Sequence, residues 1–185
     1  MFHEYETKIL DINVVEIEEK LRQLWAALIN PETLMKRWVF DVQAHEGHKG
    51  KWFRLRQQGD KTTLTYKERT WLEIGSTKEL ETQVQDFDTM AEILQQLEWK
   101  TMVYQENKRK VYSRNDIEFC IDTRPHIPTY MEIEAPSKQQ VEETLKLLWL
   151  QGQDVGDMGM IAIYEKHGMK LHNYKELRFD HQKNQ

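Results

Sequence analysis

A chain of 185 residues is long enough to bury a core without disulfides, and we expect one domain over 1–185. Its formal net charge of -5 argues against a general nucleic-acid binder, because a phosphate-contacting surface makes such domains basic. The single cysteine, Cys120, excludes an intramolecular disulfide and fits a cytoplasmic protein. No apolar run reaches membrane-spanning length, and no signal-like segment precedes the first expected strand, so we expect no membrane partner.

The first predicted strand begins almost at the N-terminus. There Glu4, Glu6 and Lys8 alternate with less polar residues, so an extended strand presents two carboxylates and one ammonium on the same face. Like charges two residues apart repel, and they are tolerated best when water or a counter-charge such as a metal ion lies between them.

Three helices are expected where a capping residue precedes apolar residues at helical spacing. They are a helix over about 13 to 26 after Asn13, one after Asp86 or Asp88, and one after Ser137. Seven more strands are expected from the alternation of polar and apolar residues, at 34 to 42, 52 to 57, 62 to 69, 77 to 84, 102 to 112, 116 to 122 and 129 to 135. Most join as hairpins, which favours one antiparallel sheet or barrel of the α+β class over alternating parallel units.

These strands repeat the pattern of the first one. One face of each strand is apolar and the other carries charges, with acidic pairs and basic pairs on separate strands. The charged or polar positions include Arg54 and Arg56, Thr65 and Lys67, Glu79 and Glu81, Glu118 and Asp122, and Glu132 and Glu134.

Two interpretations fit these charged faces. Antiparallel strands commonly bury one face and expose the other to water, and for any single strand this is the favoured interpretation. Taken together, however, the separated acidic and basic pairs and the amphipathic helices suggest a barrel whose core lies between sheet and helices and whose lumen is ionic. A polyphosphate chelated by a divalent metal would supply both signs of charge to such a lumen.

Seven short segments carry a resemblance to a known family. They are Glu4-Tyr5-Glu6-Thr7-Lys8, Arg54-Leu55-Arg56, Thr65-Tyr66-Lys67, Lys78-Glu79-Leu80-Glu81, Lys108-Arg109, Cys120-Ile121-Asp122 and Met131-Glu132-Ile133-Glu134. Their order and spacing over residues 4 to 134 resemble the CYTH superfamily, the triphosphate tunnel metalloenzymes. The resemblance implies an eight-stranded antiparallel tunnel barrel with helices packed outside, which binds a triphosphate-containing small molecule with Mg²⁺ or Mn²⁺.

The resemblance also implies roles for individual residues. The implied triphosphate-binding set is Lys8, Arg54, Arg56, Lys67 and Arg109. The implied metal-binding set is Glu4, Glu6, Glu81, Asp122, Glu132 and Glu134. Among these residues, the assigned catalytic ones are Glu4, Glu6 and Lys67.

One position departs from the family pattern. The family often has two basic residues, two positions apart, on the sixth strand, but Asn107 stands two residues before Arg109. One positive charge of the expected triphosphate-binding set is therefore missing there. The family also has a basic residue near its C-terminus. The sequence does not single out one of Lys166, Lys170 and Lys175 as its counterpart.

Three functions follow, and the sequence leaves them open. The favoured one is a metal-dependent hydrolase of inorganic triphosphate, thiamine triphosphate or a nucleoside triphosphate. The second is a class IV adenylate cyclase that converts ATP to cyclic AMP and pyrophosphate. The third is a binding module that retains polyphosphate without turnover, which Asn107 keeps in consideration. The oligomeric state is also open, with a homodimer as one alternative.

Other features favour structural interpretations. The segment from His45 to His48 lies in a glycine-containing loop and lacks HExxH spacing, so we expect a surface loop and not a zinc site. Cys120 is expected to pack in or beneath the barrel lumen and not to act as a nucleophile. For each of the six tryptophans, core packing is the expected role.

Overall fold

The computed structural model describes residues 5–42, 50–69, 77–99 and 101–179. By its internal contacts the chain divides into two compact units. Unit 1 contains Met1–Thr33, Glu73–Ser76 and Lys108–Leu171, and unit 2 contains Leu34–Leu72, Thr77–Asn107 and His172–Gln185. The prediction of one domain over 1–185 is not tested by this division and stays a prediction.

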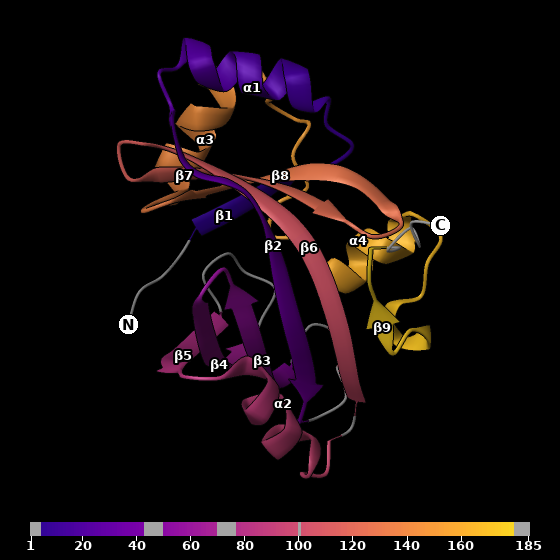
Figure 1. The fold of residues 1–185 in the computed structure, drawn as a ribbon. Coiled ribbons are helices and arrows are strands. Elements are labelled where there is room, and N and C mark those ends of the chain that lie inside the picture. Colours follow the sequence, from indigo (N-terminus) through magenta and orange to yellow (C-terminus); the bar gives the residue numbers. More distant parts are fainter. Residues whose placement is uncertain (1–4, 43–49, 70–76, 100, 180–185) are drawn as a thin grey trace, which may run out of the picture. The chain divides into compact units, whose positions relative to one another are not determined.

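The fold is of the α+β class, as predicted (Figure 1). Its strands are β1 (Tyr5–Ile9), β2 (Ala27–Asp41), β3 (Gly50–Gln58), β4 (Lys61–Arg69), β5 (Thr77–Val84), β6 (Thr101–Arg114), β7 (Ile117–Arg124), β8 (Ile127–Ala135) and β9 (Glu176–Leu177). Its helices are α1 (Val14–Gln23), α2 (Phe87–Gln95), α3 (Lys138–Leu147) and α4 (Met160–Lys166), followed by the 3₁₀ turn η1 (Leu171–Asn173).

The first eight strands form the predicted antiparallel sheet. Their order is β1-β8-β7-β6-β2-β3-β4-β5, and β9 adds a short parallel pairing to β6. Within the described residues this order starts at β1 and ends at β5, so hydrogen bonds do not close the sheet. In that same part of the chain, no helix combines the length and apolar character needed to span a membrane.

In unit 1, α1 and α3 cover the apolar face of β1, β8 and β7 (Figure 1). Ile17 of α1 and Leu145 of α3 pack in one buried cluster with Phe119 of β7 and Ile133 of β8. Alternation along each strand places these apolar side chains on one face and the charged ones on the other. Helix α1 begins where the sequence predicts, because the Asn13 side chain accepts hydrogen bonds from two backbone amides of the first turn.

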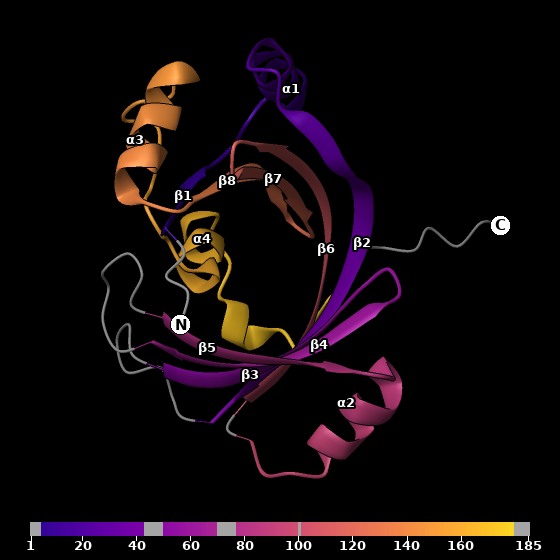
Figure 2. The same cartoon turned by 90° about the vertical axis from the view of Figure 1, so that its left-hand side faces the viewer.

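In unit 2, α2 lies on one side of the strands β3, β4 and β5 (Figure 2). Its Phe87, Ala91 and Leu94 are buried in a second cluster with Phe40 of β2 and Leu55 of β3. Of the two candidate caps, Asp86 is the one that accepts from the amide of Thr89. Since Leu55 faces α2, the neighbouring arginines of β3 face the opposite side of the sheet.

Three elements differ from expectation. Helix α4 lies outside the three expected helices. Strand β2 begins at Ala27, well before the predicted start at 34, and it continues through Asn30-Pro31. This dipeptide is typical of a turn, but the fixed φ of proline also suits an extended backbone where its missing N–H is not required. Strand β9 has only two residues, which is too short to show a periodic pattern.

Candidate functional site

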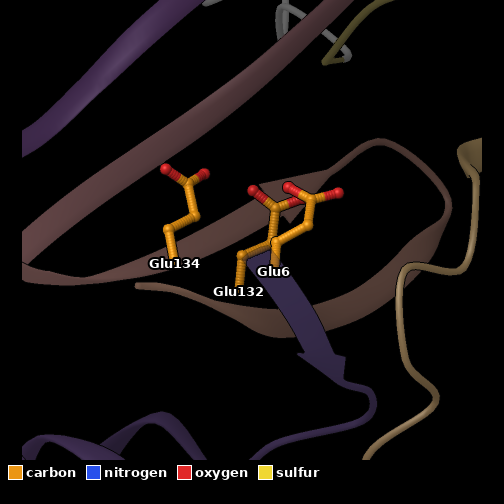
Figure 3. Close-up of side chains that lie close together, drawn as sticks. All are labelled: Glu6, Glu132 and Glu134. Carbon is orange, nitrogen blue, oxygen red and sulfur yellow. The ribbon is translucent and has the colours of Figure 1, made fainter. Parts of the chain in front are cut away.

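The charged face of unit 1 gathers three glutamates from two strands. The antiparallel register of β1 and β8 pairs Glu6 with Glu134 and Lys8 with Glu132. Ligand atoms from Glu6, Glu132 and Glu134 lie within 4.8 Å of one another. Figure 3 shows the three carboxylates on the same side of the strands that carry them.

Lys8 is buried among carboxylates on this face. Its Nζ lies 2.7 Å from Glu6 Oε1, 3.4 Å from Asp157 Oδ1 and 3.7 Å from Glu132 Oε1. Burial disfavours the charged amine, but the attraction of Glu132, Glu6 and Asp157 is larger in sum and raises the pKa of Lys8. Lys8 is therefore a fixed cation of the site.

Asp157 reaches this site through the segment that follows α3. The Lys8 amide donates to Gly156 O at 3.2 Å, and the Val155 amide donates to Lys8 O at 2.9 Å. These bonds hold the segment beside β1 and place the Asp157 carboxylate next to Lys8. The sequence analysis missed Asp157, because it lies in an irregular segment where no period of two or 3.6 assigns a face.

Arg109 of β6 is the second cation of the acidic face. It donates to Asp122 through Nε at 3.1 Å and through Nη2 at 2.5 Å, and Nη2 also donates to Glu132. Burial opposes the charge of Arg109, but Glu132 and Asp122 raise its pKa. For Glu132, burial favours the neutral acid, yet Arg109 and Lys8 lower its pKa. The carboxylate is thus held ionised between two cations.

This arrangement suits a hard divalent cation. Carboxylate oxygens are the ligands that Mg²⁺ and Mn²⁺ prefer, and the cluster of Glu6, Glu132 and Glu134 offers three within a short distance. Glu132 already accepts from Arg109 and faces Lys8, so a metal ion would share this carboxylate with the protein's own cations. Glu6 is shared in the same way, because its Oε1 accepts from Lys8 Nζ.

The charged face of unit 2 is predominantly basic. Cross-strand register aligns Arg54 of β3 with Thr65 of β4 and Thr65 with Glu81 of β5. Glu81 Oε2 accepts from Thr65 Oγ1 at 2.7 Å and lies 3.8 Å from Arg54 Nη2 and 4.0 Å from Arg56 Nη2. One carboxylate therefore lies between two guanidinium groups.

Electrostatics at Glu81 follow from these contacts. Burial favours its neutral form, but the hydrogen bond from Thr65 and the charges of Arg56 and Arg54 lower the pKa of Glu81. On the same face, Lys67 Nζ donates to Glu79 Oε1. The side chains of Arg54, Arg56 and Lys67 are 16%, 24% and 16% exposed, so these cations are half-buried and still reachable from solvent.

The predicted site residues thus fall into two groups. Unit 1 brings together Glu6, Lys8, Arg109, Asp122, Glu132 and Glu134. Unit 2 brings together Arg54, Arg56, Lys67 and Glu81. Glu4 and the loop from His45 to His48 lie outside the described residues. Lys166, Lys170 and Lys175 are exposed.

Comparison with known proteins identifies the family. The family model described as CYTH domain matches residues 3–156, which confirms the resemblance drawn from the motifs. No curated protein matches the chain.

Solved structures share the fold at low sequence identity. A protein from Pyrococcus horikoshii OT3 superposes with a TM-score of 0.71 and 23% identity, covering 86% of this chain and 98% of its own. A Hippeastrum protein described as an adenylyl cyclase candidate with a dominant triphosphatase activity has a TM-score of 0.57 and 15% identity, covering 90% and 96%. A Vibrio parahaemolyticus protein described as an adenylate cyclase candidate has a TM-score of 0.57 and 13% identity, covering 97% and 95%.

Proposed function

Because the chain belongs to the CYTH domain family, we propose that it is an enzyme that hydrolyses triphosphates with the help of a divalent metal ion. The observation that carries this proposal is the cluster of Glu6, Glu132 and Glu134, whose ligand atoms lie within 4.8 Å of one another. The dominant triphosphatase activity described for the Hippeastrum protein supports hydrolysis as the favoured reaction.

The acidic face of unit 1 would hold the metal ion. Glu6, Glu132 and Glu134 would be its ligands, with Glu6 and Glu132 shared between the metal ion and the protein's own cations, and Glu4 and Asp122 would complete the predicted acidic set. When bound, Mg²⁺ or Mn²⁺ would polarise phosphoryl oxygens and make a water molecule more acidic. The carboxylates would hold the metal ion in one place, because the register of β1 and β8 fixes their positions.

The basic face of unit 2 would bind the phosphate chain. Arg54 and Arg56 present planar guanidinium groups, which suit pairs of phosphate oxygens, and Lys67 adds a compact charge. Glu81 and Glu79 serve as the counter-ions of these cations in the structure. A triphosphate carries more negative charge than these two carboxylates and would therefore compete with them for the cations.

Lys8 and Arg109 would change partners when substrate binds. In the structure both contact Glu132, a member of the metal-binding cluster. If Glu132 served as a metal ligand, Lys8 would keep its contacts with Glu6 and Asp157 and Arg109 its bonds to Asp122, and the side of each cation that now contacts Glu132 would be open to phosphate oxygens. The predicted roles of Lys8 and Arg109 as substrate contacts are consistent with this exchange.

A product assay tests the proposal. Purified protein is incubated with inorganic triphosphate, thiamine triphosphate or ATP and with Mg²⁺ or Mn²⁺, and orthophosphate, pyrophosphate and cyclic AMP are separated. We expect metal-dependent release of orthophosphate. Formation of cyclic AMP and pyrophosphate from ATP would show that the protein is a cyclase and not a hydrolase. Binding without any product would leave only the binding module.

Two variants with matched controls assign the activity to this site. Glu134→Gln is expected to reduce turnover at least 100-fold with little unfolding, because it removes a ligand charge from a half-buried position. Glu142→Gln, on the exposed side of α3, is its control. Arg56→Gln is expected to weaken triphosphate binding about tenfold, whereas Arg22→Gln at the exposed end of α1 should not. Full turnover in Glu134→Gln would rule out the assigned metal cluster.

A further inference from the structure

Strand β2 adds a third arginine to the basic face of unit 2. The antiparallel register of β2 and β3 pairs Arg37 with Arg56 and Val39 with Arg54. Directly paired residues of neighbouring strands project to the same face, with Cβ atoms about 5 Å apart. Arg37 therefore lies on the same side of the sheet as Arg54 and Arg56, opposite the cluster packed on α2.

The pairing of two arginines is unfavourable by itself. Like charges directly opposite on neighbouring strands repel, and burial makes the repulsion stronger because less water screens it. Arg37 is 8% exposed and the Arg56 side chain is 24% exposed. A multiply charged anion between the two guanidinium groups would be attracted to both.

A neutral group orients Arg37. Its Nη2 donates to the side-chain oxygen of Asn107 on β6, and Asn107 is fully buried. The Asn107 amide nitrogen in turn lies 3.6 Å from Met35 Sδ, which fixes the direction of the amide. Asn107 thus holds the Arg37 guanidinium group in one orientation on the basic face.

We propose that Arg37 is a substrate-contacting residue, which binds phosphate oxygens of a triphosphate beside Arg56, and that Asn107 is the positioning residue that orients its guanidinium group. This inference rests on the proposed function, since it takes the ligand of the basic face to be a triphosphate. It also gives a role to Asn107, which stands on β6 where the family often has a basic residue. Arg37 of β2 would supply the positive charge that is absent at that position.

Asn107→Asp separates this role from a purely structural one. The substitution keeps the shape of the side chain but places a carboxylate against Arg37, as in the pairs of unit 1. If Arg37 only stabilises the fold, the new ion pair leaves triphosphate affinity unchanged. If Arg37 binds the substrate, the added carboxylate competes with the phosphate oxygens for its guanidinium group, and the affinity falls while the protein stays folded.

Calorimetric titration with inorganic triphosphate, without metal ion so that no turnover occurs, measures these effects. We expect both Arg37→Gln and Asn107→Asp to raise the dissociation constant about tenfold or more, and Arg37→Lys to raise it less because the charge remains. Lys36→Gln is the control, since Lys36 is adjacent in sequence but projects to the opposite face of β2; we expect less than a twofold change. Circular dichroism and melting curves establish that each variant is folded.

Three outcomes decide the matter. Weaker binding in Asn107→Asp and Arg37→Lys, with Lys36→Gln unchanged, supports the inference even if Arg37→Gln fails to fold. Wild-type affinity in folded Arg37→Lys and Asn107→Asp overturns the role of Arg37 and leaves the proposed function standing. Absence of triphosphate binding to the wild-type protein overturns the proposed function itself and the inference with it.

Discussion

Glu132 is the carboxylate that Lys8 and Arg109 share on the acidic face. Lys8 Nζ lies 3.7 Å from it, and Arg109 donates to it directly. The side chains of Lys8 and Glu132 are only 5% and 9% exposed. Charges in such positions are stable only when they are paired, and removing one partner leaves the others buried without full compensation.

We therefore predict that Glu132→Gln destabilises the protein by about 3 kcal/mol at pH 7. The pKa of Glu132 is lowered in the folded state, so its contribution is present above the unfolded pKa and is lost as the pH falls through the folded pKa. Urea unfolding of wild type and variant between pH 7 and pH 3 checks this. The two stabilities should converge at the acid end of the range.

Glu134→Gln is the comparison for that experiment. Glu134 lies on the same strand and face but is half-buried, so its loss should cost clearly less than the loss of Glu132. Equal costs for the two variants would contradict the view that Glu132 is specifically held between Lys8 and Arg109.

Regular alternation explains which site residues could be predicted. A period of two fixes the face of a strand residue once the apolar face is known, so Glu6, Lys8 and Glu132 could be placed together before their register was known. The partners of Arg37 could not be found in this way. Its neighbours in sequence, Lys36 and Trp38, give no regular alternation of charge, and its contact with Asn107 depends on the pairing of distant strands.

At the scale of elements, α1 and α3 end in the same unusual way. In each, a tryptophan adopts a left-handed backbone conformation, with φ of 57° at Trp25 and 56° at Trp149. The amide of the residue after Trp149 bonds to Leu145 O at 2.9 Å, and the Trp149 amide bonds to Lys146 O at 3.1 Å. This is the Schellman arrangement, in which glycine is the usual residue at the left-handed position.

Both tryptophans contradict the expectation of core packing. Trp25 is 87% exposed and Trp149 is 80% exposed. Residue type alone predicts burial, because tryptophan has a large apolar surface. The local arrangement overrides this preference, since the tryptophan at the left-handed position of each turn is exposed while the residue after it, Ala26 or Leu150, packs in the buried cluster.

We predict that Trp149→Gly stabilises the protein by about 1 kcal/mol, because glycine adopts the left-handed conformation without strain and little packing is lost at an exposed position. For a protein of this size the melting temperature should rise by about 2–4 °C. Trp149→Ala is the matched control, because alanine keeps the strain, and it should give little gain. Equal melting temperatures for the glycine and alanine variants would show that the backbone conformation is not the cause.

Helix starts were more predictable than strand ends. Asn13, Asp86 and Ser137 each accept a hydrogen bond from a backbone amide of the first turn, and this chemistry is local in sequence. The extent of β2 is set by the strands beside it, so the turn-like Asn30-Pro31 did not mark its boundary. Pairing with β6 likewise creates β9 from a two-residue segment.

For the whole molecule, the two units differ in the sign of their charged faces. In unit 1, carboxylates outnumber cations around Glu6, Glu132 and Glu134. In unit 2, cations outnumber carboxylates around Arg54 and Arg56. Each face by itself fits one partner of a metal–triphosphate complex, the acidic face a cation and the basic face an anion, and a net charge of -5 for the chain conceals this division.

The proposed function predicts that metal and triphosphate binding are coupled, because the substrate would bind as its metal complex, and that variants on the two faces have separate effects. With a non-hydrolysable triphosphate analogue, we expect Mg²⁺ to tighten binding to the wild-type protein about tenfold or more. Glu134→Gln should lose this gain, while its affinity without metal is unchanged or tighter because one negative charge has been removed. Arg56→Gln should bind more weakly with and without Mg²⁺ and keep the ratio between the two. Titration calorimetry at fixed ionic strength measures all six combinations of protein and metal. A Glu134→Gln variant that keeps the full effect of Mg²⁺ would place the metal ion elsewhere, and an Arg56→Gln variant that loses only this effect would reverse the roles assigned to the two faces.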